Sequence, residues 1–206
     1  MPKANERGHS RARDGERREA ILQAAIRVFA KKGYHGCRIA DVAREAGVAY
    51  GLVYHYFQNK EDLLSSVFDE SFGQFVRLLD AIAATEGPAA QKVEEIVAAA
   101  FDAYQTAPES IRVLILEVLR SPVFREAEQR DAFQEAIRLI ASVLRRGVER
   151  GELRAIDPFV GATALFGAIE MALTTLVMQT PGSDLGNVDL ARRGVVEIFL
   201  RGAAAG

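Results

Sequence analysis

Residues 18–64 constrain the fold of this chain more than any other segment. Apolar residues at helical spacing run up to Gly33, and two short helical segments follow, separated by Gly47 and ended by Asn59. Glycine tolerates the positive φ that a tight turn between two helices requires, and asparagine caps the N-terminus of a helix. The pattern predicts a helix-turn-helix inside a small helical domain, with helices at about 16–32, 39–46, 50–54 and 60–84.

The rest of the chain is also expected to be helical, because no segment shows the sustained apolar–polar alternation of a half-buried strand. Breaks are expected at Gly87-Pro88, near Pro108, at Ser121-Pro122, at Gly151, at Asp157-Pro158 and across residues 180–187. The expected fold class is therefore all-α, with about nine helices. A disordered basic arm at residues 1–15 is expected to precede a helix-turn-helix domain at 16–60 and a second helical domain at 61–206.

The net charge of −2 hides an uneven distribution of charge along the chain. Residues 1–60 hold 12 lysines and arginines against 6 acidic residues, whereas residues 61–206 hold 14 against 22. Contact with DNA phosphates requires a positive surface, and the positive third of this chain coincides with the helix-turn-helix. Double-stranded DNA is therefore the expected partner.

The second short helix of the motif is expected to face the major groove, where side chains near the start of a helix reach base edges. Tyrosine hydroxyls and a lysine ammonium beside that helix suit the flanking phosphates, and an arginine suits phosphate or guanine. Tyr54 and Phe57 are alternatively core aromatics, and His55 is alternatively a surface histidine without a role. The candidate DNA-contacting residues are Arg38, Tyr50, Gly51, Tyr54, His55, Tyr56 and Lys60.

Other classes of function lack the sequence patterns that their chemistry needs. The chain has no GxSxG turn, phosphate-binding loop, dinucleotide fingerprint or HExxH motif, so we expect no enzyme. Its three histidines have no cysteine or acidic cluster at ligand spacing, so we expect no metal site. Cys37 is the only cysteine, which fits a reducing, cytoplasmic compartment, and no uninterrupted apolar run is long enough to span a membrane. A helical protein-interaction module is the competing class.

The segment GY-x4-IADVAREAGVAYGLVYHYFQNKEDLL resembles the DNA-binding region of the TetR/AcrR family of bacterial transcriptional regulators, over roughly residues 17–64. The resemblance implies an all-helical homodimer whose N-terminal domains bind a palindromic operator and whose C-terminal domains bind a small effector that releases DNA. It also implies that the seven candidates above contact DNA. The chain departs from the family at Cys37 and Arg38, where members commonly carry Thr or Ser, and the weaker helix cap is expected to cost about 1 kcal/mol.

The segments NKEDLLSSVFDESFGQF and RGVERGELRAIDPFVGATALFGAIEMALTTLVM resemble a narrower group, the fatty-acid-degradation repressors of the FadR type. This resemblance implies a long-chain acyl-CoA as effector and no other cofactor. A regulator of efflux or other metabolism, with a different hydrophobic effector, is the alternative.

An acyl-CoA needs a long apolar wall for its chain and cations for its phosphates. The apolar stripes that supply such a wall are alternatively packed core. The candidate ligand-binding residues are Phe72, Phe75, Leu79, Phe101, Tyr104, Arg112, Leu114, Arg120, Phe133, Phe166, Glu170 and Met171, with Arg77 as a further phosphate partner.

Two segments near the C-terminus are expected to form the homodimer interface. Residues 158–178 are apolar around most of a helix, so one subunit alone does not bury them, and residues 189–201 carry a second apolar face. A twofold dimer presents two recognition helices to half-sites about 34–36 Å apart or a multiple of that spacing. Effector in the second domain is expected to shift the helix at 60–84, which links both domains, and so to lower operator affinity.

Overall fold

The computed structural model describes residues 4–118, 127–179 and 187–203, with residues 4–12 and Ala203 as backbone only. Every regular element in these ranges is a helix, which confirms the all-α fold class. The helices are α1 (Ala4–Lys32), α2 (Ile39–Ala46), α3 (Tyr50–Tyr56), α4 (Lys60–Ala84), α5 (Ala89–Thr106), α6 (Pro108–Val113), the π-helical turn η1 (Leu114–Val118), α7 (Ala127–Glu149), α8 (Pro158–Val177) and α9 (Val188–Ala203).

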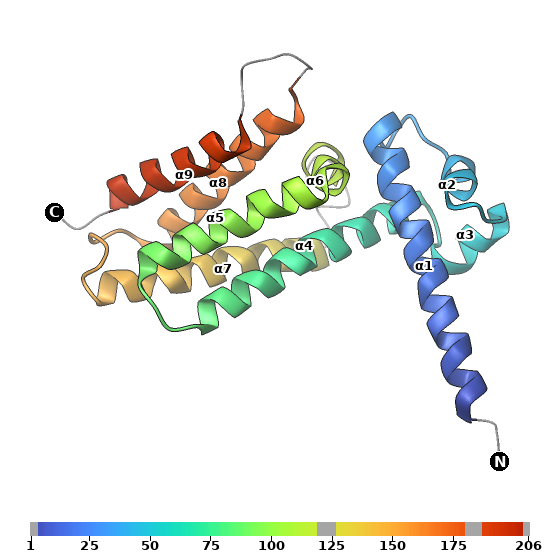
Figure 1. Cartoon of the computed structure of the whole chain (residues 1–206), viewed down its shortest axis with the longest axis horizontal. Coiled ribbons are helices and arrows are strands. Elements are labelled where there is room, and N and C mark those ends of the chain that lie inside the picture. Colours follow the sequence, from blue (N-terminus) through green and yellow to red (C-terminus); the bar gives the residue numbers. More distant parts are fainter. Residues whose placement is uncertain (1–3, 119–126, 180–186, 204–206) are drawn as a thin grey trace.

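The helices form two groups joined by α4 (Figure 1). At one end α1 packs against α2, and α2 against α3. From there α4 runs into a bundle in which it packs against α5 and α7, while α8 packs against α7 and α9. The short α6 lies beside α1, so the bundle contacts the first group through a second element besides α4.

Local capping signals fix most helix ends where the sequence places them. Gly47 ends α2 with φ 66°, and the main-chain N–H of Val48 donates to the Ala43 carbonyl over 3.0 Å. Asn59 caps α4, because its Oδ1 accepts the N–H of Asp62 at 2.7 Å. Asp157 caps α8 and is followed by a proline at the first helical position, as predicted.

One helix end differs from its prediction, and two predicted breaks are not described by the structure. The third helix extends to Tyr56, two residues beyond the predicted end, because the ladder continues until the Phe57 N–H donates to the Val53 carbonyl. The break expected at Ser121-Pro122, and all but the last residue of the break expected across 180–187, lie outside the described residues.

The expected disordered arm at residues 1–15 is wrong for residues 4–15, which form the first turns of α1. These turns project beyond the rest of the N-terminal group (Figure 1). Alanine, arginine and glutamate favour helix, and each residue added to an existing helix gains a hydrogen bond without a new nucleation cost. The Tyr56 hydroxyl also donates to the Asp14 carboxylate at 2.5 Å, which ties this extension to α3.

One described helix, α8, is long and apolar enough in composition to cross a bilayer. The sequence-based exclusion of any such segment was therefore too strict, since it required a run without charges and α8 contains Glu170. About 44% of the relevant stretch is buried inside the protein, and core helices of soluble proteins meet the same criterion. The burial of α8 against α7 identifies it as part of the bundle.

Close packing between α7 and the start of α5 gives a test of the bundle. A Cβ at Gly147 would lie 2.5 Å from the Ala89 Cβ, so we expect Gly147→Ala to lower the free energy of unfolding by about 1–3 kcal/mol. Gly15 in α1 has nothing within 4 Å of that position, so Gly15→Ala is expected to raise the free energy of unfolding by up to about 1 kcal/mol. Urea unfolding followed by circular dichroism, at equal protein concentration, distinguishes the two. Equal stability of the variants would contradict the packing described.

Candidate DNA interface and effector cavity

The core of the N-terminal group determines which side of α3 is exposed. Val53 is fully buried and Phe57 is 2% exposed, so these two side chains anchor α3 in the core, where it packs against α2. The Arg18 guanidinium of α1 lies 5.1 Å from the centre of the Phe57 ring. Phe57 is therefore the core aromatic that the sequence suggested, whereas Tyr54 is not, because it is 45% exposed. Gly51 and His55 lie on the exposed side as well.

Two tyrosines dominate the exposed side of α3. Tyr50 is 54% exposed, its hydroxyl lies 3.1 Å from that of Tyr54, and the two rings meet edge to face with centroids 5.2 Å apart. The hydrogen bond from Tyr50, together with partial desolvation, raises the pKa of Tyr54. The Tyr54 hydroxyl therefore stays protonated at neutral pH. Since one of the two hydroxyls donates to the other, the second is left to donate to a phosphate oxygen or a base edge.

The surface of α3 around Gly51 is open. A Cβ at Gly51 would meet no atom within 4 Å, so the packing of this protein does not require glycine there. A residue without a side chain at the start of a recognition helix allows close approach of another molecule's backbone or bases.

The start of α2 is supported by Asp41 rather than by a side chain at the N-cap position. Arg38 occupies the N-cap position without a side-chain cap, which agrees with the predicted weakness. Asp41 compensates in part, because its carboxylate accepts the main-chain N–H of Arg38 at 2.9 Å. Lys32 donates to the same carboxylate at 2.8 Å, and these bonds lower the pKa of Asp41. Among the described residues no hydrogen bond or ion pair is made by the Arg38 guanidinium, which is exposed at the start of α2.

Two of the seven candidates for DNA contact have partners inside the protein. The half-buried Lys60 ammonium donates to the carbonyls of Tyr34 at 2.8 Å and Cys37 at 3.2 Å, and lies 4.3 Å from the centre of the Tyr34 ring. Tyr56 donates its hydroxyl to Asp14. Lys60 therefore joins the first turn of α4 to the loop between α1 and α2, a role that its position beside the motif does not reveal.

A cavity of about 120 Å³ lies inside the C-terminal bundle, between α4, α5, α6, η1 and α8. Five of the predicted ligand residues line it: Phe72, Phe75, Leu114, Phe166 and Glu170. Sequence reasoning missed lining residues on the same helical faces, among them Ile111, Ile115, Ile169 and Leu173. Spacing of three or four residues from the predicted members would have indicated most of these.

The other predicted ligand residues lie elsewhere, and the physical reason differs for each. Leu79 and Phe101 are core side chains, only 1% and 0% exposed, while the Phe133 ring supports the lining from behind at 5.1 Å from Phe166. Met171 is 64% exposed on the outer side of α8, and Arg77 is exposed on α4. Tyr104 lies half-buried near Pro108, outside the cavity lining. Arg120 lies outside the described residues.

Arg112, predicted to bind a phosphate, instead connects three helices. Its guanidinium donates to the carbonyl of Val177 at 2.9 Å and to that of Ala30 at 3.3 Å, the C-terminal ends of α8 and α1. Five residues later Glu117 in η1 accepts the main-chain N–H of Tyr34 at 3.0 Å. The segment 111–117 therefore lines the cavity with Ile111, Leu114 and Ile115 and holds the N-terminal group with Arg112 and Glu117.

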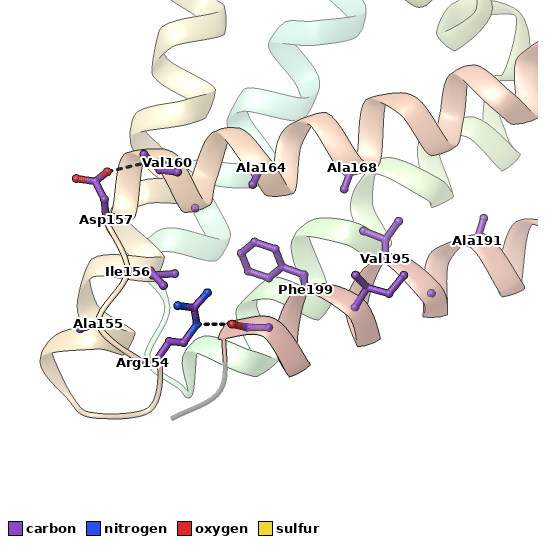
Figure 2. A pocket seen from close by; sticks show the side chains of 14 residues that line it. Arg154, Ala155, Ile156, Asp157, Val160, Ala164, Ala168, Ala191, Val195 and Phe199 are labelled. Carbon is purple, nitrogen blue, oxygen red and sulfur yellow. Dashed lines mark hydrogen bonds between the residues drawn. The ribbon is translucent and has the colours of Figure 1, made fainter. Parts of the chain in front are cut away.

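A wider hollow of about 780 Å³ lies on the outside of the bundle, between α8, α9 and the loop before α8. Figure 2 shows its lining of small and apolar side chains, with Ala164, Ala168 and Val195 along the two helices and Phe199 between them. Exposed apolar residues flank it, including Val160 at 66% and Ile198 at 77%. Its size reflects an uncovered helix face rather than an enclosed ligand site.

The internal role of Lys60 makes a prediction. Lys60→Met leaves two main-chain carbonyls without their donor, so we expect the free energy of unfolding to fall by about 1–3 kcal/mol. Lys31→Met is the matched control, because Lys31 is exposed and has no hydrogen bond or ion pair within the described residues; its effect should be below about 0.5 kcal/mol. Urea unfolding measures both, and equal effects would show that the Lys60 ammonium does not stabilise the fold.

Two family models match the chain, one for each group of helices. Residues 21–67 match the model described as bacterial regulatory proteins, tetR family, and residues 90–169 match a tetracyclin repressor-like C-terminal domain. The fatty acid metabolism regulator protein of Bacillus subtilis (strain 168) is 30% identical over 166 residues, which cover 80% of this chain and 86% of that protein.

Solved structures agree with this match. The transcriptional regulator FadR from Bacillus subtilis, in complex with stearoyl-CoA, superposes with a TM-score of 0.78 at 29% identity, covering 89% of this chain and 98% of that one. The fatty acid degradation regulator FadR from Bacillus halodurans gives a TM-score of 0.77 at 27% identity, over 89% and 98% of the two chains. Both predicted resemblances are confirmed, and the chain belongs to the TetR family of bacterial regulatory proteins.

Proposed function

We propose that this protein is a transcriptional repressor that leaves a palindromic operator when a long-chain acyl-CoA occupies the cavity of its C-terminal bundle. The observation that carries the proposal is the segment 111–117, which lines an apolar cavity and holds the N-terminal group through Arg112 and Glu117. A ligand that displaces this segment changes the contacts of the helix-turn-helix directly. Such a link between two sites is what an effector-dependent change in affinity requires.

The operator contacts fall to the exposed side of α3 and the start of α2. Tyr50, Gly51, Tyr54 and His55 face the major groove, and Arg38 reaches an adjacent phosphate or guanine. Tyr56 and Lys60 belong to the same surface, but each must keep or exchange its internal partner when DNA binds. Residues 16–60 thus form the DNA-binding part, and residues 61–206 form the part that binds effector and dimerises.

The outer faces of α8 and α9 form the homodimer interface. A hollow of about 780 Å³ and exposed side chains such as Val160 and Ile198 leave apolar surface uncovered in one subunit. A second copy related by a twofold axis covers this surface with the same two helices, which removes apolar area from water and places two recognition helices on one side of the DNA.

The acyl-CoA assignment rests on similarity to FadR from Bacillus subtilis, whose solved structure contains stearoyl-CoA, and on the apolar lining of the cavity. Pockets for drug-sized ligands usually enclose about 300–1,000 Å³, so a cavity of 120 Å³ must expand to hold a long chain. Expansion displaces the packed rings of Phe72, Phe75 and Phe166 or the turn η1, and the second of these carries Glu117.

The same small volume favours one alternative, a TetR-type regulator of other metabolism with a shorter hydrophobic effector. In either form the protein is a cytoplasmic DNA-binding regulator without enzymatic activity, like the regulators to which it is similar. The helical interaction module that competes with this function does not account for the exposed Tyr50 and Tyr54 on α3 or for the exposed Arg38 at the start of α2.

The decisive experiment is fluorescence anisotropy with the full-length protein and the intergenic DNA upstream of its own gene. We expect sequence-preferring binding that weakens steeply with salt, and release by stearoyl-CoA but not by free CoA. Binding that ignores stearoyl-CoA would remove the acyl-CoA assignment and keep the regulator. Absence of sequence preference, both there and in a selection from random operators, would contradict the DNA-binding function.

The hydrogen bonds that Arg112 makes to the ends of α1 and α8 predict a variant that binds effector without a change in operator affinity. In Arg112→Met we expect the affinity for stearoyl-CoA to stay within about threefold, while the ratio of operator affinities without and with effector falls by about tenfold, since typical coupling free energies are about 1–3 kcal/mol. Arg138→Met removes an exposed arginine paired with Glu135 on α7 and is the matched control. Anisotropy titrations with and without effector measure the ratio, and an unchanged ratio would exclude this route.

A further inference from the structure

We propose that Glu170 makes the effector cavity reject anions, so that the group entering it is uncharged or cationic and a free fatty acid is not an effector. This inference rests on the proposed function in one respect, that the cavity is the effector site. It concerns the charge of the ligand, which the apolar lining alone does not decide.

The cavity is lined almost entirely by apolar side chains. Its polar lining residues in the described part of the chain are Ser71, Gln74 and Glu170, and Glu170 alone bears a formal charge. Gln74 donates its side-chain amide to Glu70 at 2.6 Å, so this group is already engaged along the surface of α4. Glu170 is therefore the one acidic residue, and the one formally charged residue, on the described walls.

No described cation neutralises this carboxylate. The ion pairs between described residues do not include Glu170. Arg112, on the neighbouring α6, directs its guanidinium to main-chain carbonyls at the ends of α1 and α8. The half-buried Glu170 thus lines the cavity without an ion-pair partner among the described residues.

The position of Glu170 on α8 explains why it belongs to the cavity. Phe166, Ile169 and Leu173 lie four, one and three residues from Glu170 along α8 and line the same wall. A core position of this kind usually carries an apolar residue, because an ionised carboxylate in an apolar site is costly. A charged group retained at such a place is a candidate for ligand discrimination.

Like charges at short distance repel strongly where water is scarce. A fatty acid that inserts its carboxylate among these side chains meets Glu170, whereas an alcohol, an amide or an ammonium is able to donate a hydrogen bond to it. An acyl thioester is also uncharged at the group that enters. The phosphates of the CoA group then have to lie outside this cavity.

The test compares three ligands with the same chain and different head groups: decanoate, decanol and decylamine. Isothermal titration calorimetry with the full-length protein at neutral pH gives their affinities. We expect decylamine and decanol to bind at least tenfold more tightly than decanoate, a difference of about 1.4 kcal/mol or more. In Glu170→Gln we expect the preference for decanol over decanoate to fall by at least threefold, although decanoate still has to desolvate its own carboxylate.

Glu94→Gln is the matched control, because Glu94 is exposed on α5 and does not line the cavity. It should keep the wild-type order of affinities, and circular dichroism melting shows whether all three proteins are folded. Equal affinities in the wild type, the same discrimination in Glu170→Gln, or no binding of any of the three ligands would overturn the inference.

Stearoyl-CoA, added as a fourth ligand, separates this inference from the proposed function. Suppose that stearoyl-CoA neither binds the protein nor releases it from DNA, and that the preference for decanol over decanoate depends on Glu170. The acyl-CoA assignment then fails, and the rejection of anions by Glu170 stands. If stearoyl-CoA binds, and decanoate binds the wild type and Glu170→Gln equally well, the rejection of anions by Glu170 fails and the acyl-CoA assignment stands.

Discussion

The structure depends on one uninterrupted helix that packs against α1 of the N-terminal group and against α5 and α7 of the bundle. Helix α4 has 25 residues, which corresponds to a length of about 37 Å at 1.5 Å per residue. Leu63 and Leu64 near its start are fully buried, and Phe72 further along is 3% exposed beside the cavity. Because a continuous helix is stiff, we expect a displacement at the cavity to be carried along α4 toward its first turn.

Main-chain carbonyls at helix ends are the second recurring element, and cations satisfy them. Lys60 binds the carbonyls of the loop after α1, Arg112 those that end α1 and α8, and Arg146 donates to Ala83 at 2.6 Å near the end of α4. The buried Lys92 donates to Ile82 and Thr85 at the same end of α4, and its burial lowers its pKa. Cations near a helix C-terminus are favoured by the partial negative charge there.

This use of cations explains where prediction from the sequence was incomplete. A lysine or arginine near a DNA motif or an apolar pocket suggests a phosphate partner, and both Lys60 and Arg112 were interpreted in this way. Their carbonyl partners lie 26 and 23 residues away for Lys60, and 82 and 65 residues away for Arg112. Spacing within one helix contains no information on contacts over such separations.

By itself the sequence determined the helices, the turn at Gly47, the cap at Asn59 and the exposure of Tyr50 and His55 on α3, because these follow from local hydrogen bonds and from the side of a short helix that is apolar. Only the tertiary structure decided that Phe72 and Phe166 face a cavity while Leu79 and Phe101 are core. All four belong to apolar stripes with the same spacing, and a stripe records that a face is buried without recording what it is buried against. The packing of five elements around one space makes that distinction.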